Sequence, residues 1–324
     1  MTTAPTLDDL RQAHRRIAAH IHNTPLLRCE ALDAMAGARL FFKCENLQKT
    51  GSFKARGATN AVLQLSDSEA ARGVVTVSSG NHAAAIARAA RARGIPAFIV
   101  MPSNAPATKC RAVEGYGGKI TFCEPNMQAR EAVAKKLLEE TGGALIHPYD
   151  NPRVIAGQGT AALEILERVP DLDFLLVPVS GGGLLSGSAI AAKSLRPAVQ
   201  VIGCEPAGAD DAFRSLASGR IEPVGNPDTI ADGLRAQLCP LTFAIIRERV
   251  DRIVTVTEAE IVSAMRDVWE RMKLIIEPSA AVAAAPALQR ALGPAAAGKK
   301  IAILLSGGNV DLDALPFTKT SLKS

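Results

Sequence analysis

Aromatic residues are scarce in this chain: one tryptophan, two tyrosines and nine phenylalanines make up 4% of its 324 residues. No run of five like charges occurs, and the formal net charge of +5 is the difference between 37 Lys and Arg and 32 Asp and Glu spread along the sequence. A nucleic-acid-binding surface needs clustered basic side chains, often with aromatic rings that stack on bases. The composition therefore predicts no nucleic-acid partner, and its abundant Ala, Val, Ile and Leu predict an aliphatic core of the α/β type.

Cysteine motifs and long apolar runs are also missing. The six cysteines include no CxxC pair and show no metal-finger spacing with the five histidines, so we expect reduced cysteines buried as small apolar residues. No apolar stretch approaches the roughly 20 residues that cross a bilayer, and the first residues, MTTAPTLDDLRQAHRR, lack the apolar core of a signal peptide. These absences predict a cytoplasmic protein that does not bind a membrane.

Short aliphatic segments alternate regularly with amphipathic stretches, which is typical of a mostly parallel sheet covered by helices. The expected strands are Leu40–Cys44, Val74–Val77, Ala97–Met101, Lys119–Phe122, Phe174–Val179, Val199–Gly203, Ile253–Val256 and Ile301–Leu305. The expected helices are Phe53–Leu65, Asn81–Arg93, Met127–Glu140, Ala156–Glu167, Leu184–Leu195 and Glu258–Met272. Because the strands are unevenly spaced, the pattern favours an open α/β fold over a closed barrel. The length predicts one large or two moderate domains, with the three β–α units of residues 73–146 as a candidate smaller one.

Glycine-rich turns occur in four places, and an open α/β fold binds its ligand at such turns. They are Thr50–Gly57, Ser78–Asn81, Ser180–Gly187 and Ser306–Asn309. The third turn follows an apolar strand and opens a helix, so its backbone N–H groups suit a phosphate. Gly181, Gly183 and Gly187 equally imitate a dinucleotide fingerprint, with Glu205 as the acidic residue that would bind a ribose. On this turn alone, a nicotinamide cofactor, another phosphorylated cofactor and a purely structural turn all stay open.

Lys54 follows a Thr-Gly-Ser-Phe turn and lies at the start of a predicted helix. The positive end of the helix dipole disfavours its ammonium form, and the neighbouring Phe53 and small residues should also lower its pKa. A lysine with a lowered pKa is a suitable nucleophile for a Schiff base. The alternative interpretation is an ordinary exposed lysine.

The stretch Lys43–Ala58 resembles the lysine motif of the fold-type II pyridoxal-phosphate enzymes, whose two-domain fold is like that of tryptophan synthase β. Within that class, six further motifs resemble those of the serine/threonine dehydratases and serine racemases, and they occur in the same order as in that family. They are Ser-Ser-Gly-Asn-His at 78–82, Ser-Gly-Gly-Gly-Leu at 180–184, Glu-Pro-Ala-Gly-Ala-Asp-Asp at 205–211, Thr-Ile-Ala-Asp-Gly at 229–233, Trp-Glu-Arg-Met-Lys-Leu-Ile-Ile-Glu-Pro at 269–278 and Ser-Gly-Gly-Asn at 306–309. The resemblance covers essentially the whole chain. It implies open, mostly parallel sheets flanked by helices, with a small mobile domain of residues 47–146 and a large cofactor-binding domain of residues 1–46 and 147–324.

The resemblance also implies pyridoxal 5'-phosphate as the cofactor and gives individual residues a role. Lys54 would carry the cofactor and then remove the substrate α-proton. Phe53 and Gly233 would pack on the two faces of the cofactor ring, Asn81 would hydrogen-bond the ring hydroxyl, and Ser306 would lie at the pyridine nitrogen. The phosphate would be held by the turn made of Ser180, Gly181, Gly182, Gly183 and Leu184.

A small amino-acid substrate would contact Ser78, Ser79, Asn81, His82 and Arg130, again by resemblance. Ser79 would face the α-carbon opposite Lys54 and return a proton there, as racemisation requires. The alternative is a serine that only binds the substrate carboxylate. His82 has a structural hydrogen-bonding role as its alternative interpretation.

Arg130 shares one face of its predicted helix with Val133, Ala134 and Leu137. A guanidinium on an apolar face needs an anionic partner, which is either a substrate carboxylate or a structural ion pair between the domains.

Glu205 and Asp211, with the Ala209 carbonyl between them, match the divalent-cation site of the family. Oxygen ligands of this kind suit Mg²⁺ or Ca²⁺, although two carboxylates six residues apart are weak evidence alone. The family also implies a homodimer.

The activity implied by the resemblance is that of a dehydratase, or ammonia-lyase, which converts serine, threonine or 3-hydroxyaspartate to a 2-oxo acid and ammonia by α,β-elimination. A serine racemase with side dehydratase activity is the alternative within the family. A nicotinamide-dependent oxidoreductase and a catalytically silent binding protein are the alternatives outside it. The chain departs from the racemase pattern at Ala84, which replaces a glutamine, at Ser180, which replaces a glycine, and at Ala236, where racemases tend to carry a serine. These departures leave the substrate open.

Overall fold

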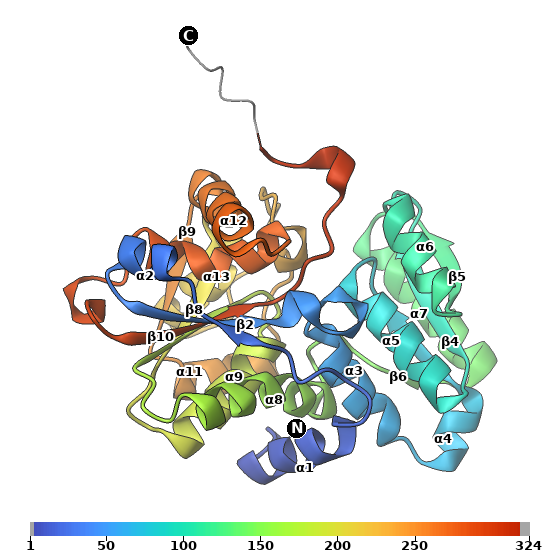
Figure 1. Ribbon diagram of the computed structural model, residues 1–324. Helices are drawn as coiled ribbons and strands as arrows, with labels where there is room; N and C mark the ends of the chain where they lie inside the picture. Colours follow the sequence, from blue (N-terminus) through green and yellow to red (C-terminus); the bar gives the residue numbers. More distant parts are fainter. Residues whose placement is uncertain (1–2, 318–324) are drawn as a thin grey trace.

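The computed structural model describes residues 3–317, which form two open sheets with helices on both faces (Figure 1). The strands are β1 (Leu26–Leu27), β2 (Arg39–Cys44), β3 (Val74–Val77), β4 (Ala97–Pro102), β5 (Lys119–Cys123), β6 (Ala144–Leu145), β7 (Phe174–Pro178), β8 (Gln200–Pro206), β9 (Arg252–Val256) and β10 (Lys300–Leu305). The α-helices are α1 (Leu7–Ile17), α2 (Glu30–Ala36), α3 (Lys54–Leu63), α4 (Asp67–Arg72), α5 (Asn81–Arg93), α6 (Ala107–Gly115), α7 (Met127–Thr141), α8 (Pro152–Arg168), α9 (Gly183–Leu195), α10 (Asp211–Ser218), α11 (Pro240–Arg249), α12 (Glu258–Met272) and α13 (Pro278–Leu288). Single 3₁₀ turns are η1 (Glu45–Leu47), η2 (Lys49–Gly51), η3 (Ala207–Ala209), η4 (Asp232–Leu234), η5 (Pro294–Ala296) and η6 (Leu312–Ala314). The predicted α/β class with mostly parallel sheets is confirmed.

The larger sheet has the strand order β1-β2-β10-β7-β8-β9, and all its pairings are parallel except that of β1 with β2. Neighbouring residues of β7 enter different cores because side chains alternate along a strand. Leu175 and Val177 pack with α1, α8, α9 and α11, whereas Phe174 and Leu176 pack with α2, α12 and α13. Figure 1 shows these helix groups on opposite faces of the sheet. Burial on both faces explains why the central strands are continuous aliphatic runs.

The smaller sheet has the order β5-β4-β3-β6, with parallel pairings throughout, and forms the right-hand part of Figure 1. Its residues, 74–145, lie within the predicted small domain 47–146. The domain boundaries themselves stay a prediction, and residues 1–2 and 318–324 of the predicted large domain lie outside the described residues.

Helix α3 connects the two sheet layers, because it packs against α5 of the smaller layer and α8 of the larger one. Glycines permit the close contact between α3 and α8: a Cβ atom on Gly157 would lie 2.6 Å from the Cα of Gly57. Lys54 is the first residue of α3. The packing of α3 therefore fixes the position of the Lys54 backbone, from which its side chain extends.

Two features of the fold differ from the sequence prediction. The strands β1 and β6 have two residues each, which is too short for a periodic pattern to reveal. Helix α8 begins at Pro152 rather than Ala156, because Asn151 accepts hydrogen bonds from the N–H groups of Arg153 and Val154 and proline is well suited to the first turn. None of the helices within residues 3–317 is both long and apolar enough to cross a membrane.

Candidate active site

Lys54 has a desolvated amine with no carboxylate bound to it directly. Its Nζ lies 3.4 Å from the Pro148 carbonyl oxygen and 5.1 Å from the centroid of the Phe53 ring. Burial lowers the pKa of Lys54 to about 8, while the Glu277 carboxylate opposes this effect. The sequence predicted the direction of this shift, although burial rather than the helix dipole is its main cause.

The turn between β7 and α9, residues 180–183, has no room for side chains at its glycines, and we call it the glycine cradle. Gly182 has φ +88°, and a Cβ atom on Gly181 would lie 2.3 Å from a ring carbon of Tyr149. The first N–H groups of a helix have no acceptor within the helix, so the start of α9 presents donors to an anion. Ser180, the residue that replaces a glycine, accepts a hydrogen bond from the Ala236 N–H (3.0 Å) and donates one to the Ala236 carbonyl (3.2 Å). The serine therefore anchors the turn to the segment that follows η4.

Glu205 was the proposed ribose ligand of the nicotinamide alternative. It accepts hydrogen bonds from the N–H groups of Ala212 (3.0 Å) and Phe213 (2.8 Å), in the first turn of α10. Its two oxygens thus stabilise a helix start, and this arrangement argues against a ribose at that position.

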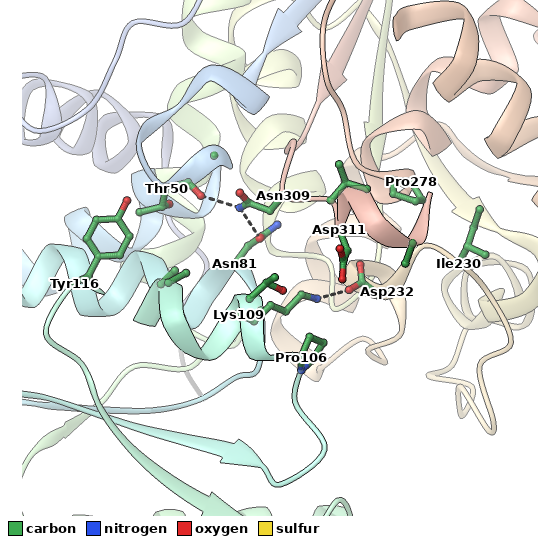
Figure 2. A pocket seen from close by; sticks show the side chains of 17 residues that line it. Thr50, Asn81, Pro106, Lys109, Tyr116, Ile230, Asp232, Pro278, Asn309 and Asp311 are labelled. Atoms are coloured by element: carbon green, nitrogen blue, oxygen red, sulfur yellow. Dashed lines mark hydrogen bonds and ion pairs between the residues drawn. The ribbon is translucent and has the colours of Figure 1, made fainter. Parts of the chain in front are cut away.

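Asn81, at the start of α5, belongs to a row of amides that joins the two layers (Figure 2). Its Nδ2 donates to Glu277 Oε1 (2.9 Å), and its Oδ1 accepts from Nδ2 of Asn309 (2.8 Å). A cavity of about 560 Å³ adjoins this row, and the ion pair of Lys109 with Asp232 lies at its wall. Lys54 is not among the residues that line the cavity. The two amides of the row therefore line the cavity, whereas the Lys54 side chain does not.

The other predicted cofactor residues lie on the turns around Lys54. The Phe53 N–H donates to the carbonyl of Ser306 (3.0 Å), and the Ser306 side chain is buried. Gly233, in η4, donates its N–H to the Ser279 hydroxyl at the start of α13 (3.0 Å). A backbone hydrogen bond thus joins the first and fourth glycine-rich turns, and a backbone-to-side-chain bond joins η4 to α13.

The predicted substrate loop connects β3 to α5. Ser78 Oγ accepts the Gly80 N–H (3.3 Å), and Ser79 is half-buried beside it. His82 is buried, with Nε2 3.2 Å from the Ile146 carbonyl, and burial lowers its pKa to about 3. A neutral ring that donates Nε2–H has no proton on Nδ1, so His82 in this state is a structural hydrogen-bonding residue rather than a donor to a carboxylate.

Arg130 is half-buried on α7, where Val133, Ala134 and Leu137 pack towards Val100, as its predicted helix face requires. Its Nε is buried without a hydrogen-bond partner among the described residues. The structure does not bring Arg130 into contact with the other predicted site residues, so its role stays a prediction.

The candidate metal residues Glu205, Ala209 and Asp211 are all buried at the end of β8. Burial raises the pKa of Glu205 to about 8 and that of Asp211 to about 6. Asp211 Oδ2 has no hydrogen-bond partner within residues 3–317. In the same part of the chain, no cluster of three or more His, Cys, Asp or Glu side chains is found.

Sequence reasoning missed His147, Tyr149, Glu277 and a role for Asn309. His147 and Tyr149 follow β6 and stack edge to face, 4.6 Å apart, with Tyr149 against the glycine cradle. The two-residue strand before them carries no periodic signal. Glu277 immediately precedes Pro278, which is suited to the first turn of a helix, but its side chain makes no cap there.

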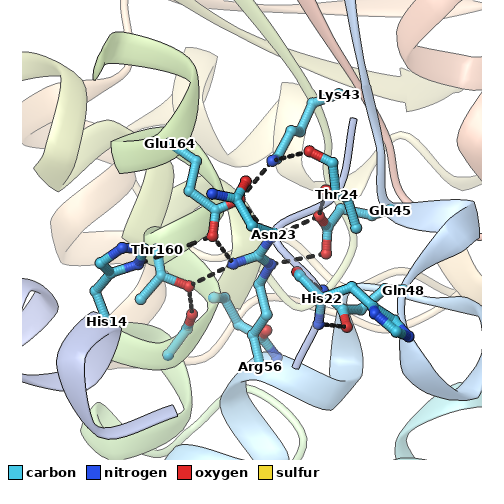
Figure 3. A network of polar contacts seen from close by, with 12 residues as sticks. His14, His22, Asn23, Thr24, Lys43, Glu45, Gln48, Arg56, Thr160 and Glu164 are labelled. Atoms are coloured by element: carbon cyan, nitrogen blue, oxygen red, sulfur yellow. Dashed lines mark hydrogen bonds and ion pairs between the residues drawn. The ribbon is translucent and has the colours of Figure 1, made fainter. Parts of the chain in front are cut away.

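A buried ionic network holds α3 behind Lys54 (Figure 3). All five N–H donors of Arg56 are used, by both carboxylate oxygens of Glu45, both of Glu164 and the Thr160 hydroxyl. Lys43 forms a second ion pair with Glu164. Two buried cations therefore face two buried anions, and one of the cations, Arg56, lies two residues after Lys54 in α3.

Comparison with known proteins finds relatives that match almost the whole chain. The family model for pyridoxal-phosphate-dependent enzymes matches residues 17–307. The serine racemase of Dictyostelium discoideum is 51% identical over 312 residues, covering 96% of each chain. The β-hydroxyaspartate dehydratase of Paracoccus denitrificans is 48% identical over 313 residues, covering 97% of this chain and 99% of the relative. The solved structure of maize serine racemase superposes with a TM-score of 0.94 at 48% identity, covering 96% of this chain and 95% of that chain.

These matches extend over almost the full length of the relatives, and the lysine and the glycine cradle lie inside the matched region. They favour a phosphate-bearing cofactor at the glycine cradle over a nicotinamide. The chain belongs to the family of pyridoxal-phosphate-dependent enzymes.

Proposed function

We propose that this protein is a dehydratase that converts a small β-hydroxy amino acid to a 2-oxo acid and ammonia. The observation that carries the proposal is the amine of Lys54, which has a pKa of about 8 and lies on a helix start beside a glycine cradle for an anion. A nucleophilic amine and a phosphate cradle are the two features that a pyridoxal-phosphate site needs. The dehydratase of Paracoccus denitrificans and the serine racemases among the relatives both fit this chemistry.

The residues present suit pyridoxal phosphate. Lys54 is the proposed attachment point, and the N–H groups of the turn Gly181–Leu184 are the proposed phosphate ligands, because a side chain at Gly181 would collide with Tyr149. Asn81, Ser306, Phe53 and Gly233 complete the proposed contacts to the ring. When bound, the cofactor withdraws electron density from the substrate α-carbon and makes its proton acidic.

The chain itself supplies proton transfer and orientation. Lys54, once released by the substrate amine, would take the α-proton and then, as an ammonium, give a proton to the departing β-hydroxyl, which leaves as water. The unsaturated amine set free from the enzyme hydrolyses to the 2-oxo acid and ammonia. Ser306 offers a neutral hydroxyl instead of a carboxylate to the pyridine nitrogen, which lets elimination compete better with transamination.

Serine racemisation is a second candidate activity, favoured by the serine racemases among the relatives and by Ser79 beside Asn81. Replacing Ser79 with alanine should lower racemisation of serine by about 10²-fold or more, because no hydroxyl then returns a proton on the face opposite Lys54. Elimination needs only the lysine and should fall far less. The measurement is the exchange rate between L- and D-serine beside pyruvate release, with Ser194→Ala, an exposed hydroxyl on α9, as the matched control. Full racemase activity in the Ser79→Ala variant would contradict the two-base proposal.

Arg130 is our proposed contact for a substrate carboxylate, supported by its buried, unpartnered Nε among the described residues. Ser78 and Asn81 remain proposed contacts of the amino-acid substrate, whereas for His82 we propose its alternative role, a structural hydrogen bond to the Ile146 carbonyl. The β-carboxylate of 3-hydroxyaspartate would be a suitable anion for Arg130.

A divalent cation, Mg²⁺ or Ca²⁺, is proposed at Glu205, Asp211 and the Ala209 carbonyl. Two buried carboxylates whose pKa values are raised by burial gain stability from a hard cation. With two acidic ligands the remaining positions of such a site would be filled by carbonyl oxygens and water.

The proposed function is tested by 2-oxo acid release from L-serine, D-serine, L-threonine and both 3-hydroxyaspartate diastereomers. We expect release from at least one of them, and lower activity after chelation that Mg²⁺ restores. No release and no racemisation from any substrate would refute the function, and equal activity after exhaustive chelation would refute the importance of the cation.

A homodimer in the cytoplasm is also proposed. It is supported by large apolar side chains left exposed, such as Leu47 and Ile275, and by six cysteines that form no disulfide. Sedimentation velocity at working concentration should give the mass of two chains, and the mass of one chain would contradict the dimer.

A further inference from the structure

Glu277 is a buried carboxylate that the proposed reaction does not use. It is the residue before α13, and both its oxygens accept from Asn81 Nδ2, at 2.9 and 3.2 Å. The carboxylate also packs on Gly307, where a Cβ atom would lie 2.5 Å from Oε1. Its position is therefore fixed on one side by backbone and on the other by the Asn81 amide.

The orientation of the Asn81 amide is determined at both ends. Asn309 Nδ2 donates to the Thr50 carbonyl (2.8 Å), which is a fixed acceptor, and to Asn81 Oδ1 (2.8 Å). The nitrogen of Asn81 must then face Glu277, which in its ionised form only accepts. Every hydrogen bond of this row thus has one possible direction: Asn309 donates to Thr50 and to Asn81, and Asn81 donates to Glu277.

Charges from several elements act on Glu277. Lys54 on α3 and Lys109 on α6 are the cations near it, and Asp232 in η4 is the anion. Burial, with Asp232, raises the pKa of Glu277 to about 7, against the hydrogen bond from Asn81 and the charge of Lys109. A hydrogen bond to an ionised carboxylate is roughly twice as strong as one between neutral groups, so the ionised form of Glu277 holds the amide best.

We propose that Glu277 is a positioning residue that holds the Asn81 amide, and with it the first turn of α5, in the orientation that the cofactor requires. The inference rests on the proposed function only in placing the cofactor ring beside Asn81. Glu277 touches neither substrate nor cofactor. Asn81 is the side chain that it hydrogen-bonds, and the charge that it presents to the free Lys54 amine is a separate effect. If Glu277 positions the cofactor site through Asn81, the effects of changing Glu277 and Asn81 should not be additive.

The experiment measures the release rate of pyridoxal phosphate from the holoenzyme, followed by absorbance after transfer to cofactor-free buffer. Glu277→Gln keeps the shape of the side chain and removes the charge, so we expect release about 10-fold faster. Asn81→Ala should give a similar increase, and the double variant should release no faster than Asn81→Ala alone. Glu260→Gln makes the same chemical change at the start of the neighbouring helix α12, where the carboxylate caps Thr257, and should leave the rate within twofold.

Unchanged release in Glu277→Gln, or effects of the two changes that multiply in the double variant, would overturn the proposal. If the Glu277→Gln variant loses its near-ultraviolet circular dichroism, it is not natively folded and a second variant is needed. Asn309→Ala removes a hydrogen bond from the other, exposed end of the same row. It should also speed release, and its effect should vanish in the Asn81→Ala background; an effect that persists there would overturn the proposal. If the protein binds the cofactor but acts on none of the substrates, the proposed function is refuted. The release rate of the cofactor still tests the role of Glu277 in that case.

Discussion

Replacement of Lys54 by alanine is expected to lower 2-oxo acid release by about 10³-fold or more, which is the largest effect on activity that the site predicts. The same amine attaches the cofactor and moves the α-proton, so one substitution removes both steps. The ionisable groups of residues 3–317 that interact with Lys54 are Glu277, His82 and His147, and none of them is an amine. The measurement is the steady-state rate with saturating added cofactor. Lys135→Ala, on the exposed face of α7, is the matched control and should behave as the wild type.

The pKa of Lys54 gives this prediction a pH dependence. Burial lowers that pKa to about 8, so the neutral, nucleophilic amine accumulates as the pH rises through 8. Attachment of the cofactor to the cofactor-free protein should accelerate over that interval and level off above it. A rate that keeps rising towards pH 10.4, the region of an ordinary lysine, would contradict the lowered pKa.

Replacement of Arg56 by methionine is expected to lower the free energy of unfolding by about 3–5 kcal/mol, because removal of one partner leaves buried charges without compensation. Arg56 makes five hydrogen bonds to Glu45, Glu164 and Thr160, and its side chain is fully buried. Methionine fills much of the same volume, so the loss is mainly one of charge and hydrogen bonding. Urea titration of the holoenzyme and the variant measures the difference.

Arg28 provides the matched control for Arg56. It pairs with Asp33 at the surface with its side chain half exposed, so Arg28→Met should cost about 1 kcal/mol or less. Equal losses in the two variants would show that the buried network contributes no more than a surface pair.

Much of the fold could be predicted because its signals are local. The aliphatic segment at β3 is short, β-branched and bounded by turns, and the helix of α5 has its expected limits, Asn81 and Arg93. The two-residue strands β1 and β6 carry too little sequence for the same reasoning. Fold class therefore followed from the pattern, whereas one edge strand of each sheet, β1 and β6, did not.

The candidate site was predictable where function depends on a local motif, as at Lys54 and Gly181. It was not predictable where function depends on distant residues. Glu277 lies 196 residues from Asn81, and Arg56 is 108 residues from Glu164, yet each pair is in direct contact. Nothing in the spacing of these residues indicates that folding brings them together. Residue type alone also did not distinguish a buried carboxylate from an exposed one.

The attachment of the cofactor to Lys54 is tested most directly by borohydride reduction of the protein as isolated, followed by digestion and mass spectrometry of the peptides. The account predicts a yellow protein and one modified peptide, with pyridoxal phosphate on Lys54. Modification of Lys43, Lys49 or any other lysine, or a colourless protein that takes up no cofactor, would contradict it.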